Sequence, residues 1–173
     1  GHSVRGFALR MTELADAPIV RSGSASLSYL SKFVNKERRL VKACIFCRIV
    51  LHYDPAYIIY EDDLCIAFLD KYPQSRGHLQ LIPKKHYKWI YEIPQIGKFF
   101  IVAKDLIRVI IPILEADHVS LATFGQQIEH AHLWIVPKYN KGITISEFGK
   151  RVKNLDQEKL ANTLRSALTK GGA

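Results

Sequence analysis

Hydrophobic and polar residues follow one another along this chain in patterns that predict two long helices and five strands. Apolar residues at steps of three and four predict amphipathic helices over Ile96–Glu115 and Asp156–Thr169, and Asp156 can cap the second helix. Short runs rich in β-branched and aromatic residues, bounded by turn residues, predict strands. The predicted strands are Tyr57–Glu61, Leu64–Asp70, His78–Pro83, Val119–Phe124 and Ala131–Val136.

The order of these elements indicates the α+β fold class. A hairpin that turns at Asp62 and Asp63 is followed by a third strand, a long helix and a final strand pair around Gly125. This order favours a five-stranded antiparallel sheet, covered by the long helix and the C-terminal helix.

Four segments are distinguished by their composition. Residues 1–10 precede the only methionine and are interpreted as an expression remnant. Residues 11–43 form a basic arm, within which Leu27–Val41 fits a helical stripe. Residues 44–140 form the compact domain, and residues 141–173 form a tail with the C-terminal helix.

Composition indicates a soluble chain with a single sizeable core. Of the 173 residues, 48% are hydrophobic and 24% are charged. The longest apolar stretch, Phe99–Leu114, is interrupted by charges and Pro112 and falls short of the roughly 18 residues that a membrane span needs. Because a signal peptide is also not recognisable, a cytoplasmic location is expected. The net charge of +9 favours anionic partners such as nucleotides or nucleic acid, or simply reflects solubility and a basic tail.

The three cysteines do not suggest a disulfide framework, because their number is odd and low. Cys44 and Cys47 form a C-x-x-C pair, a pattern typical of zinc binding or of redox chemistry. The redox interpretation is weaker because the residues before Cys44 are not strand-like. Cys65 lies between Leu64 and Ile66 and is interpreted as a core residue.

Histidines that could complete a zinc site lie further along the chain. His86 follows the third predicted strand and His130 begins the last one. With Cys44 and Cys47 they would form a closed Cys₂His₂ set, which has a structural role. His118 is a rival ligand by spacing, and the alternative is that the cysteines are simply small buried residues.

The segment His130-Ala131-His132-Leu133-Trp134 carries the main candidate for catalysis. Because strand side chains alternate, His130, His132 and Trp134 share one face, with neighbours about 6.5–7 Å apart. A neutral His132 imidazole could attack phosphorus, provided that an acceptor holds its other nitrogen. Gln126 and Gln127 on the preceding turn could donate amide N–H groups to a phosphate. The alternative is that His132 is a satisfied core histidine.

A possible nucleoside site lies at the end of the second predicted strand. Asp70 could accept both ribose hydroxyls there, and Phe68 offers an apolar wall for a base. A turn-capping aspartate beside a core phenylalanine is an equally good interpretation of these two residues.

Taken together, these residues resemble the histidine triad superfamily of nucleotide hydrolases and transferases. The resemblance covers roughly residues 44–140, and the order and spacing of its motifs are more specific than any motif alone. The matching motifs are Cys44-Ile45-Phe46-Cys47-Arg48-Ile49, Tyr60-Glu61-Asp62-Asp63, Ala67-Phe68-Leu69-Asp70, Pro73-Gln74, Gly77-His78, Leu81-Ile82-Pro83-Lys84-Lys85-His86, and Gly125-Gln126 through His130-Ala131-His132 to Pro137.

The resemblance implies an α+β homodimer whose two sheets join. It also implies that His132 forms a covalent bond to the α-phosphorus of a purine nucleotide, and that Asp70 and Phe68 contact ribose and base while Gln126 contacts the phosphate. Trp134 and Gln127 also line the expected nucleotide site. A structural zinc ion is implied, and it removes His118 from the set of ligands. The implied ligands are Cys44, Cys47, His86 and His130.

The chain departs from the family pattern at three positions. The third triad position holds Trp134, and Gln127 stands where many relatives have serine or threonine. No asparagine precedes the Gly-Gln turn, where Ser120 or Thr123 would have to substitute. An indole N–H cannot shuttle a proton near neutral pH, so the leaving group is in question.

The resulting hypothesis is a zinc-stabilised hydrolase or nucleotidyl transferase that acts on phosphoramidates, dinucleoside polyphosphates or adenylylated conjugates. One alternative is a nucleotide-binding module without catalysis, which would leave no nucleotide on His132. Another is removal of adenylate from nucleic-acid ends, which the net charge of +9 favours but no DNA-reading module supports. No membrane partner is expected.

Overall fold

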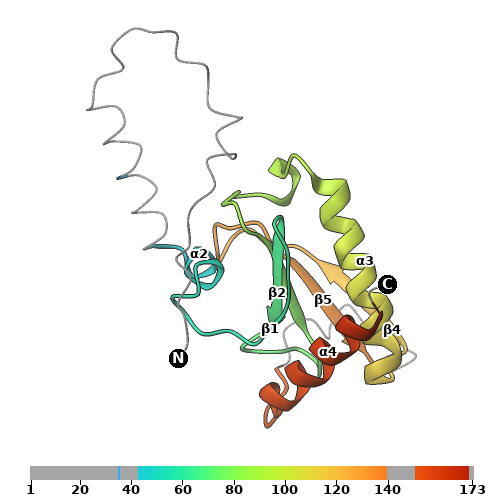
Figure 1. Cartoon of the computed structure of the whole chain (residues 1–173). Coiled ribbons are helices and arrows are strands. Elements are labelled where there is room, and N and C mark those ends of the chain that lie inside the picture. Colours follow the sequence, from blue (N-terminus) through green and yellow to red (C-terminus); the bar gives the residue numbers. More distant parts are fainter. Residues whose placement is uncertain (1–34, 36–42, 140–150, 172–173) are drawn as a thin grey trace, which may run out of the picture. The chain divides into compact units, whose positions relative to one another are not determined.

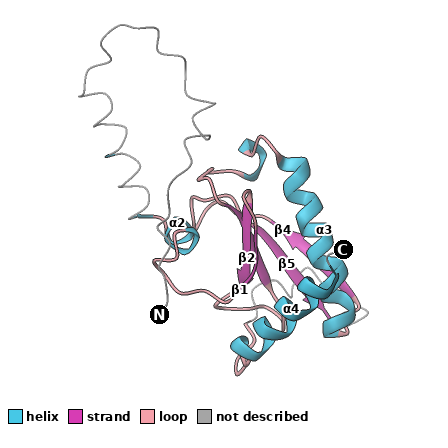
Figure 2. Ribbon diagram, in the orientation of Figure 1, coloured by secondary structure: helices cyan, strands magenta, loops and turns pink. Residues whose placement is uncertain are grey.

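A computed structural model describes residue 35, residues 43–139 and residues 151–171 of the chain. Its centre is a five-stranded antiparallel sheet in the order β1-β2-β3-β5-β4, accompanied by helices (Figures 1 and 2). The predicted α+β class, with a long helix and a C-terminal helix, is confirmed. The predicted helix Leu27–Val41 lies outside the described residues except for Asn35.

The described elements follow the predicted order, with one short helix and one 3₁₀ turn added. None of the described helices combines the length and the apolar character that a bilayer span requires. The strands are β1 (Ile58–Glu61), β2 (Cys65–Leu69), β3 (Leu79–Pro83), β4 (His118–Ala122) and β5 (Leu133–Lys138). The helices are α2 (Ile45–Val50), η2 (Ile90–Glu92), α3 (Ile96–Leu114) and α4 (Gln157–Gly171).

One face of the sheet packs against α3 and α4, which lie together on that side in Figure 1. Leu79 and Leu81 point to this face because they alternate along β3, and both are fully buried. Helix α4 contributes Leu160, Ala161 and Leu164 to the same core. The C-terminal helix is therefore an integral part of the folded unit.

The opposite face of the sheet carries α2 over one end. Phe46 and Ile49 of α2 pack there against Ile66, Phe68 and Ile82 of the sheet. Since Ile66 and Phe68 alternate with Cys65 and Ala67 along β2, the two clusters lie on opposite faces. This second face also carries the polar side chains described below.

Strand β5 begins two residues later than predicted, at Leu133 instead of Ala131. Leu133 pairs with Leu81, so the same register carried two residues further would place Ala131 opposite Pro83. Proline has no N–H to donate to a strand ladder. Ala131 instead donates its N–H to the carbonyl of Tyr87, at 2.6 Å, and the chain leaves the sheet at this point.

Polar side chains end the elements as the sequence indicates. Asp62 accepts the N–H groups of Leu64 and Cys65 in the β1–β2 turn, at 2.8 and 2.7 Å. Asp156 accepts the N–H of Lys159 at 2.9 Å and so caps α4 as predicted. Cys65 is fully buried, and burial raises the pKa of its thiol, which supports its interpretation as a core residue.

Candidate functional site

The four predicted zinc ligands come together in the structure from three separate segments. Cys44 is the N-cap residue of α2, Cys47 lies in its first turn, His86 follows β3 and His130 precedes β5. Their ligand atoms all lie within 4.8 Å of one another. We refer to these four residues as the Cys/His cluster.

Distances within the Cys/His cluster suit a tetrahedral metal ion. His130 Nδ1 lies 3.4 Å from Cys44 Sγ and 3.5 Å from Cys47 Sγ, and His86 Nδ1 lies 3.1 Å from Cys47 Sγ. In a tetrahedral zinc site with ordinary bond lengths, sulfur and nitrogen ligands are about 3.5 Å apart. Two thiols and two imidazoles are also the donor types that zinc prefers, so the residues present fit this ion.

Electrostatics in the cluster already favours a thiolate. The pKa of Cys44 is lowered, chiefly because the Cys47 thiol donates a hydrogen bond to its sulfur and also because His130 lies close by. The pKa of Cys47 is raised in turn by its hydrogen bond to the Cys44 sulfur and by burial. A bound cation would replace the shared proton and stabilise both sulfurs as thiolates.

Backbone contacts orient His130 toward the cluster. Its Nε2–H donates to the carbonyl of Pro83 at 2.9 Å, which leaves Nδ1 as the ligating nitrogen. His118 is not part of the cluster. It pairs with Lys138, at the end of β5 remote from His130.

His132 is held in one orientation by the residue two positions before it. Its Nδ1–H donates to the carbonyl of His130 at 2.8 Å, so Nε2 keeps a free lone pair. Only 4% of the residue is exposed, and burial lowers the pKa of its ring. The Phe46 ring packs edge-on against His130 and His132, at 5.8 and 5.6 Å between centroids, which places both histidines on the same side.

The side chains of Phe68, Gln80 and Trp134 form a row across this side of the sheet. Phe68 pairs with Gln80 across β2 and β3, and Gln80 pairs with Trp134 across β3 and β5. Directly opposite residues in antiparallel strands place their side chains on the same face. The Phe46 ring contacts Phe68 as well, at 5.7 Å, and so connects this row to His132. We refer to this surface as the His132 face.

Asp70 and His78 extend the His132 face by one further row. The N–H of Asp70 donates to the carbonyl of His78, and Asp70 Oδ2 accepts from Gln80 Nε2. Asp70 Oδ1 accepts the N–H of Tyr72 at 2.6 Å, and the Asp70 carbonyl accepts from Gln157 Nε2 of α4. These hydrogen bonds hold Asp70, the predicted ribose contact, in place. Phe68, the predicted base contact, is buried below this face.

Gln126 and Gln127 are exposed in the loop between β4 and β5. The preceding Gly125 lies against the Trp89 ring so closely that a Cβ atom there would fall 1.9 Å from it. Lys88 and Glu129 form an ion pair of 2.8 Å across the same contact. The segment around η2 thus supports the glutamine loop from outside.

Sequence reasoning assigned no role in the site to four residues of this region. Phe46 lies inside the C-x-x-C pair, and Trp89 lies in a segment of mixed aromatic and charged residues without a clear period. His78 and Gln80 carried a usable signal, because they alternate with Leu79 and Leu81 on one strand. Their position on the face opposite the core would have followed from that alternation.

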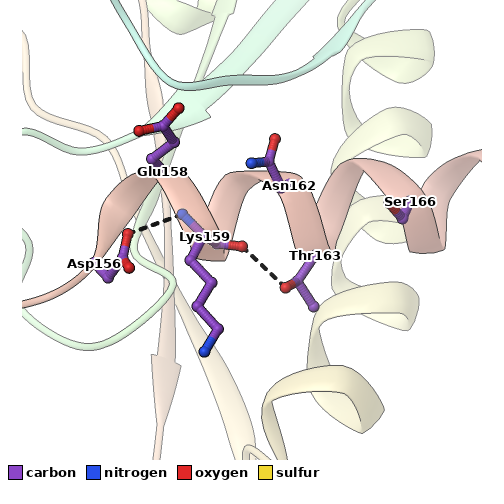
Figure 3. A pocket seen from close by; sticks show the side chains of 6 residues that line it. All are labelled: Asp156, Glu158, Lys159, Asn162, Thr163 and Ser166. Carbon is purple, nitrogen blue, oxygen red and sulfur yellow. Dashed lines mark hydrogen bonds between the residues drawn. The ribbon is translucent and has the colours of Figure 1, made fainter.

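A separate depression of about 470 Å³ runs along the exposed side of α4 (Figure 3). Its hydrogen bonds are those of the helix itself: Lys159 N–H donates to Asp156, and the Thr163 hydroxyl donates to the Lys159 carbonyl. None of the predicted site residues lines it. Its lining residues are Asp156, Glu158, Lys159, Asn162, Thr163 and Ser166.

The chain that carries this site is similar to known proteins. Residues 53–141, just over half of the chain, match the family model of the HIT domain. An uncharacterised HIT-like protein of Methanocaldococcus jannaschii is 33% identical over 129 residues, which are 70% of this chain and 98% of that protein. Adenylylsulfatase HINT3 of Arabidopsis thaliana is 31% identical over 132 residues, which are 72% of this chain and 67% of that protein.

A solved structure shares the same architecture. It is a zinc-bound histidine triad family protein from Mycobacterium smegmatis, with a TM-score of 0.65 and 30% sequence identity. The match covers 75% of this chain and 95% of that one.

Proposed function

The chain belongs to the HIT domain family, and from this membership and the geometry of His132 we propose that it hydrolyses nucleotide conjugates at the α-phosphate. The observation that carries the proposal is the 2.8 Å hydrogen bond from His132 Nδ1 to the His130 carbonyl. It fixes the tautomer in which Nε2 is nucleophilic. The adenylylsulfatase among the similar proteins supports an adenylate as the substrate.

The reaction would take place in two steps on His132. Its Nε2 forms a bond to phosphorus while the bond to the leaving group breaks, which gives a nucleotidyl-histidine. Water then attacks the phosphorus, the P–N bond breaks with its electron pair returning to Nε2, and the proton lost by the attacking water passes to solvent. Gln126 and Gln127 would donate hydrogen bonds to the phosphate oxygens as negative charge develops.

The nucleoside would bind beside the phosphate on the His132 face. Both oxygens of Asp70 accept one hydrogen bond within the chain and keep lone pairs for ribose hydroxyls. The neighbouring Phe68 and Gln80 would form the floor below a purine base, and Trp134 would lie on the phosphate side. A purine nucleotide is therefore the proposed substrate class.

The Cys/His cluster would hold a structural zinc ion. All four ligands come from the protein, so no coordination position is left for a substrate. The ion would tie α2 to the segments that contain His86 and His130. Its expected contribution is therefore to the position of the active-site residues and not to the chemical step.

We also infer that the protein is a homodimer joined along β4. This strand is at the edge of the sheet, and its unpaired backbone groups could pair with a second copy. Leu121 on this strand and Phe124 just after it are 44% and 46% exposed, so two apolar side chains at this edge are available for contact with a second copy.

Trapping of the covalent intermediate tests the proposed function. Brief incubation with an adenylate and acid quenching should add one adenylyl group to wild-type protein, mapped to His132 by mass spectrometry. His132→Ala should lose the adduct and turnover but keep its circular dichroism spectrum. The control His118→Ala should keep both adduct formation and turnover. Tight AMP binding without any adduct or turnover would instead favour a binding module.

A further inference from the structure

The side chain two residues after His132, on strand β5, is an indole. Trp134 lies between two rings, with centroids 4.7 Å from His78 and 4.9 Å from Phe124, both edge-on. Its Nε1–H is buried and has no hydrogen-bond partner in the described part of the chain. An indole N–H can donate a hydrogen bond, but it does not release its proton near neutral pH.

The other groups around Trp134 are also poor proton donors. Gln80 carries an amide, whose Nε2–H donates to Asp70. The His78 ring is fully buried, and its Nδ1 accepts the N–H of Gln74 at 3.2 Å, so its single proton is on Nε2. A neutral imidazole that released this proton would become an imidazolate, which is a very unstable product in a buried site.

The charged groups near this row of side chains do not supply a proton donor either. Asp70 accepts hydrogen bonds at both carboxylate oxygens and acts there as an acceptor. Lys138 ends β5, five residues beyond Leu133, which is a distance of about 17 Å along the strand. The described residues of the His132 face therefore offer no general acid beside the leaving group.

Building on the proposed function, we propose that the site is selective for nucleotide conjugates whose leaving group departs as a stable oxyanion, such as sulfate, carboxylate or phosphate. When His132 Nε2 bonds to phosphorus, the electron pair of the breaking P–O bond stays on the leaving oxygen, which needs no proton.

An amine leaving group presents a different problem to the same site. The electron pair of a breaking P–N bond would create an amide anion, unless a proton reaches the nitrogen during the step. General acid catalysis typically accelerates such steps by about 10²–10⁴-fold. A site without the acid should therefore cleave adenylyl sulfate about 100-fold or more faster than adenosine 5′-phosphoramidate.

The test compares kcat/KM for these two substrates in wild type and three variants. In Trp134→His, an added imidazole can deliver a proton, so the rate on the phosphoramidate should rise by about 10–100-fold relative to that on adenylyl sulfate. Trp134→Phe should keep the wild-type preference. Tyr91→His, which places an imidazole at an exposed position of η2, is the matched control and should not change the ratio.

Each outcome separates this proposal from the proposed function. Equal wild-type rates on both substrates overturn the selectivity but leave the hydrolase in place. Turnover of neither substrate, with no nucleotide attached to His132, overturns both. If Trp134→His does not fold, the wild-type ratio alone decides. A folded Trp134→His variant with an unchanged ratio also overturns the selectivity.

Discussion

Protonation of His78 should destabilise the folded protein in mildly acidic solution. The ring is fully buried at the start of β3, and burial lowers the pKa of His78 from 6.5 to about 4. Asp70 opposes this shift and Lys138 adds to it. Because the unfolded chain binds a proton more readily than the folded one, stability should fall as the pH decreases from 6.5 toward 4.

The size of this effect follows from the difference between the two pKa values. One pKa unit corresponds to about 1.4 kcal/mol, so the full loss below pH 4 is about 3 kcal/mol. At pH 5.0, His78 is mostly protonated in the unfolded chain and mostly neutral in the folded one. The free energy of unfolding should therefore be about 2 kcal/mol lower at pH 5.0 than at pH 7.5 because of His78 alone.

Urea titrations of wild type, His78→Asn and His78→Phe at both pH values isolate this contribution. Other titrating groups, including the Cys/His cluster, are common to the three proteins, so the difference in pH dependence reports on His78. Both variants should lose about 2 kcal/mol less than wild type between pH 7.5 and 5.0, although their stabilities at pH 7.5 will differ. The same loss in all three proteins would refute the reasoning.

Three further predictions address the glutamine loop, the metal and the dimer. Gly125→Ala should cost about 1–3 kcal/mol in urea unfolding and reduce kcat/KM, because its Cβ overlaps the Trp89 ring. Gly97→Ala in α3, which meets no atom within 4 Å, is the control and should be neutral or stabilising. Metal analysis should find about one zinc per chain, with less in His86→Ala, and chelation should lower the melting temperature. Leu121→Lys should convert a dimer into a monomer by light scattering, and a wild-type monomer would contradict the proposed interface.

Local patterns were sufficient to predict most of the fold. The three- and four-residue steps in α3 and α4 and the alternation in the strands are properties of short windows, which a sequence displays directly. The start of β5 was missed because it depends on Pro83, which is distant in sequence and which the register of β3 and β5 would place opposite Ala131. Where a neighbouring strand determines the end of a strand, the residue pattern of the strand itself does not reveal that end.

The site was only partly predictable, for a related reason. Cys44, Cys47, His86 and His130 were identified by motif, but the contacts of Trp134 with His78 and Phe124 depend on strand register. Register is set by long-range packing and not by any one segment. Trp89 illustrates the same limit, since its role follows from its contact with Gly125, 36 positions away in sequence.

His130 joins the proposed metal site and the proposed nucleophile in one residue. Its Nε2–H donates to Pro83, its Nδ1 belongs to the Cys/His cluster, and its carbonyl accepts from His132. This arrangement is possible because β5 begins only at Leu133, so the backbone of His130 is not paired in the sheet. A metal ion that holds the His130 ring would therefore also hold the His130 carbonyl, which fixes the His132 tautomer. A metal that takes no part in the chemical step would in this way still determine how often Nε2 is presented as a nucleophile.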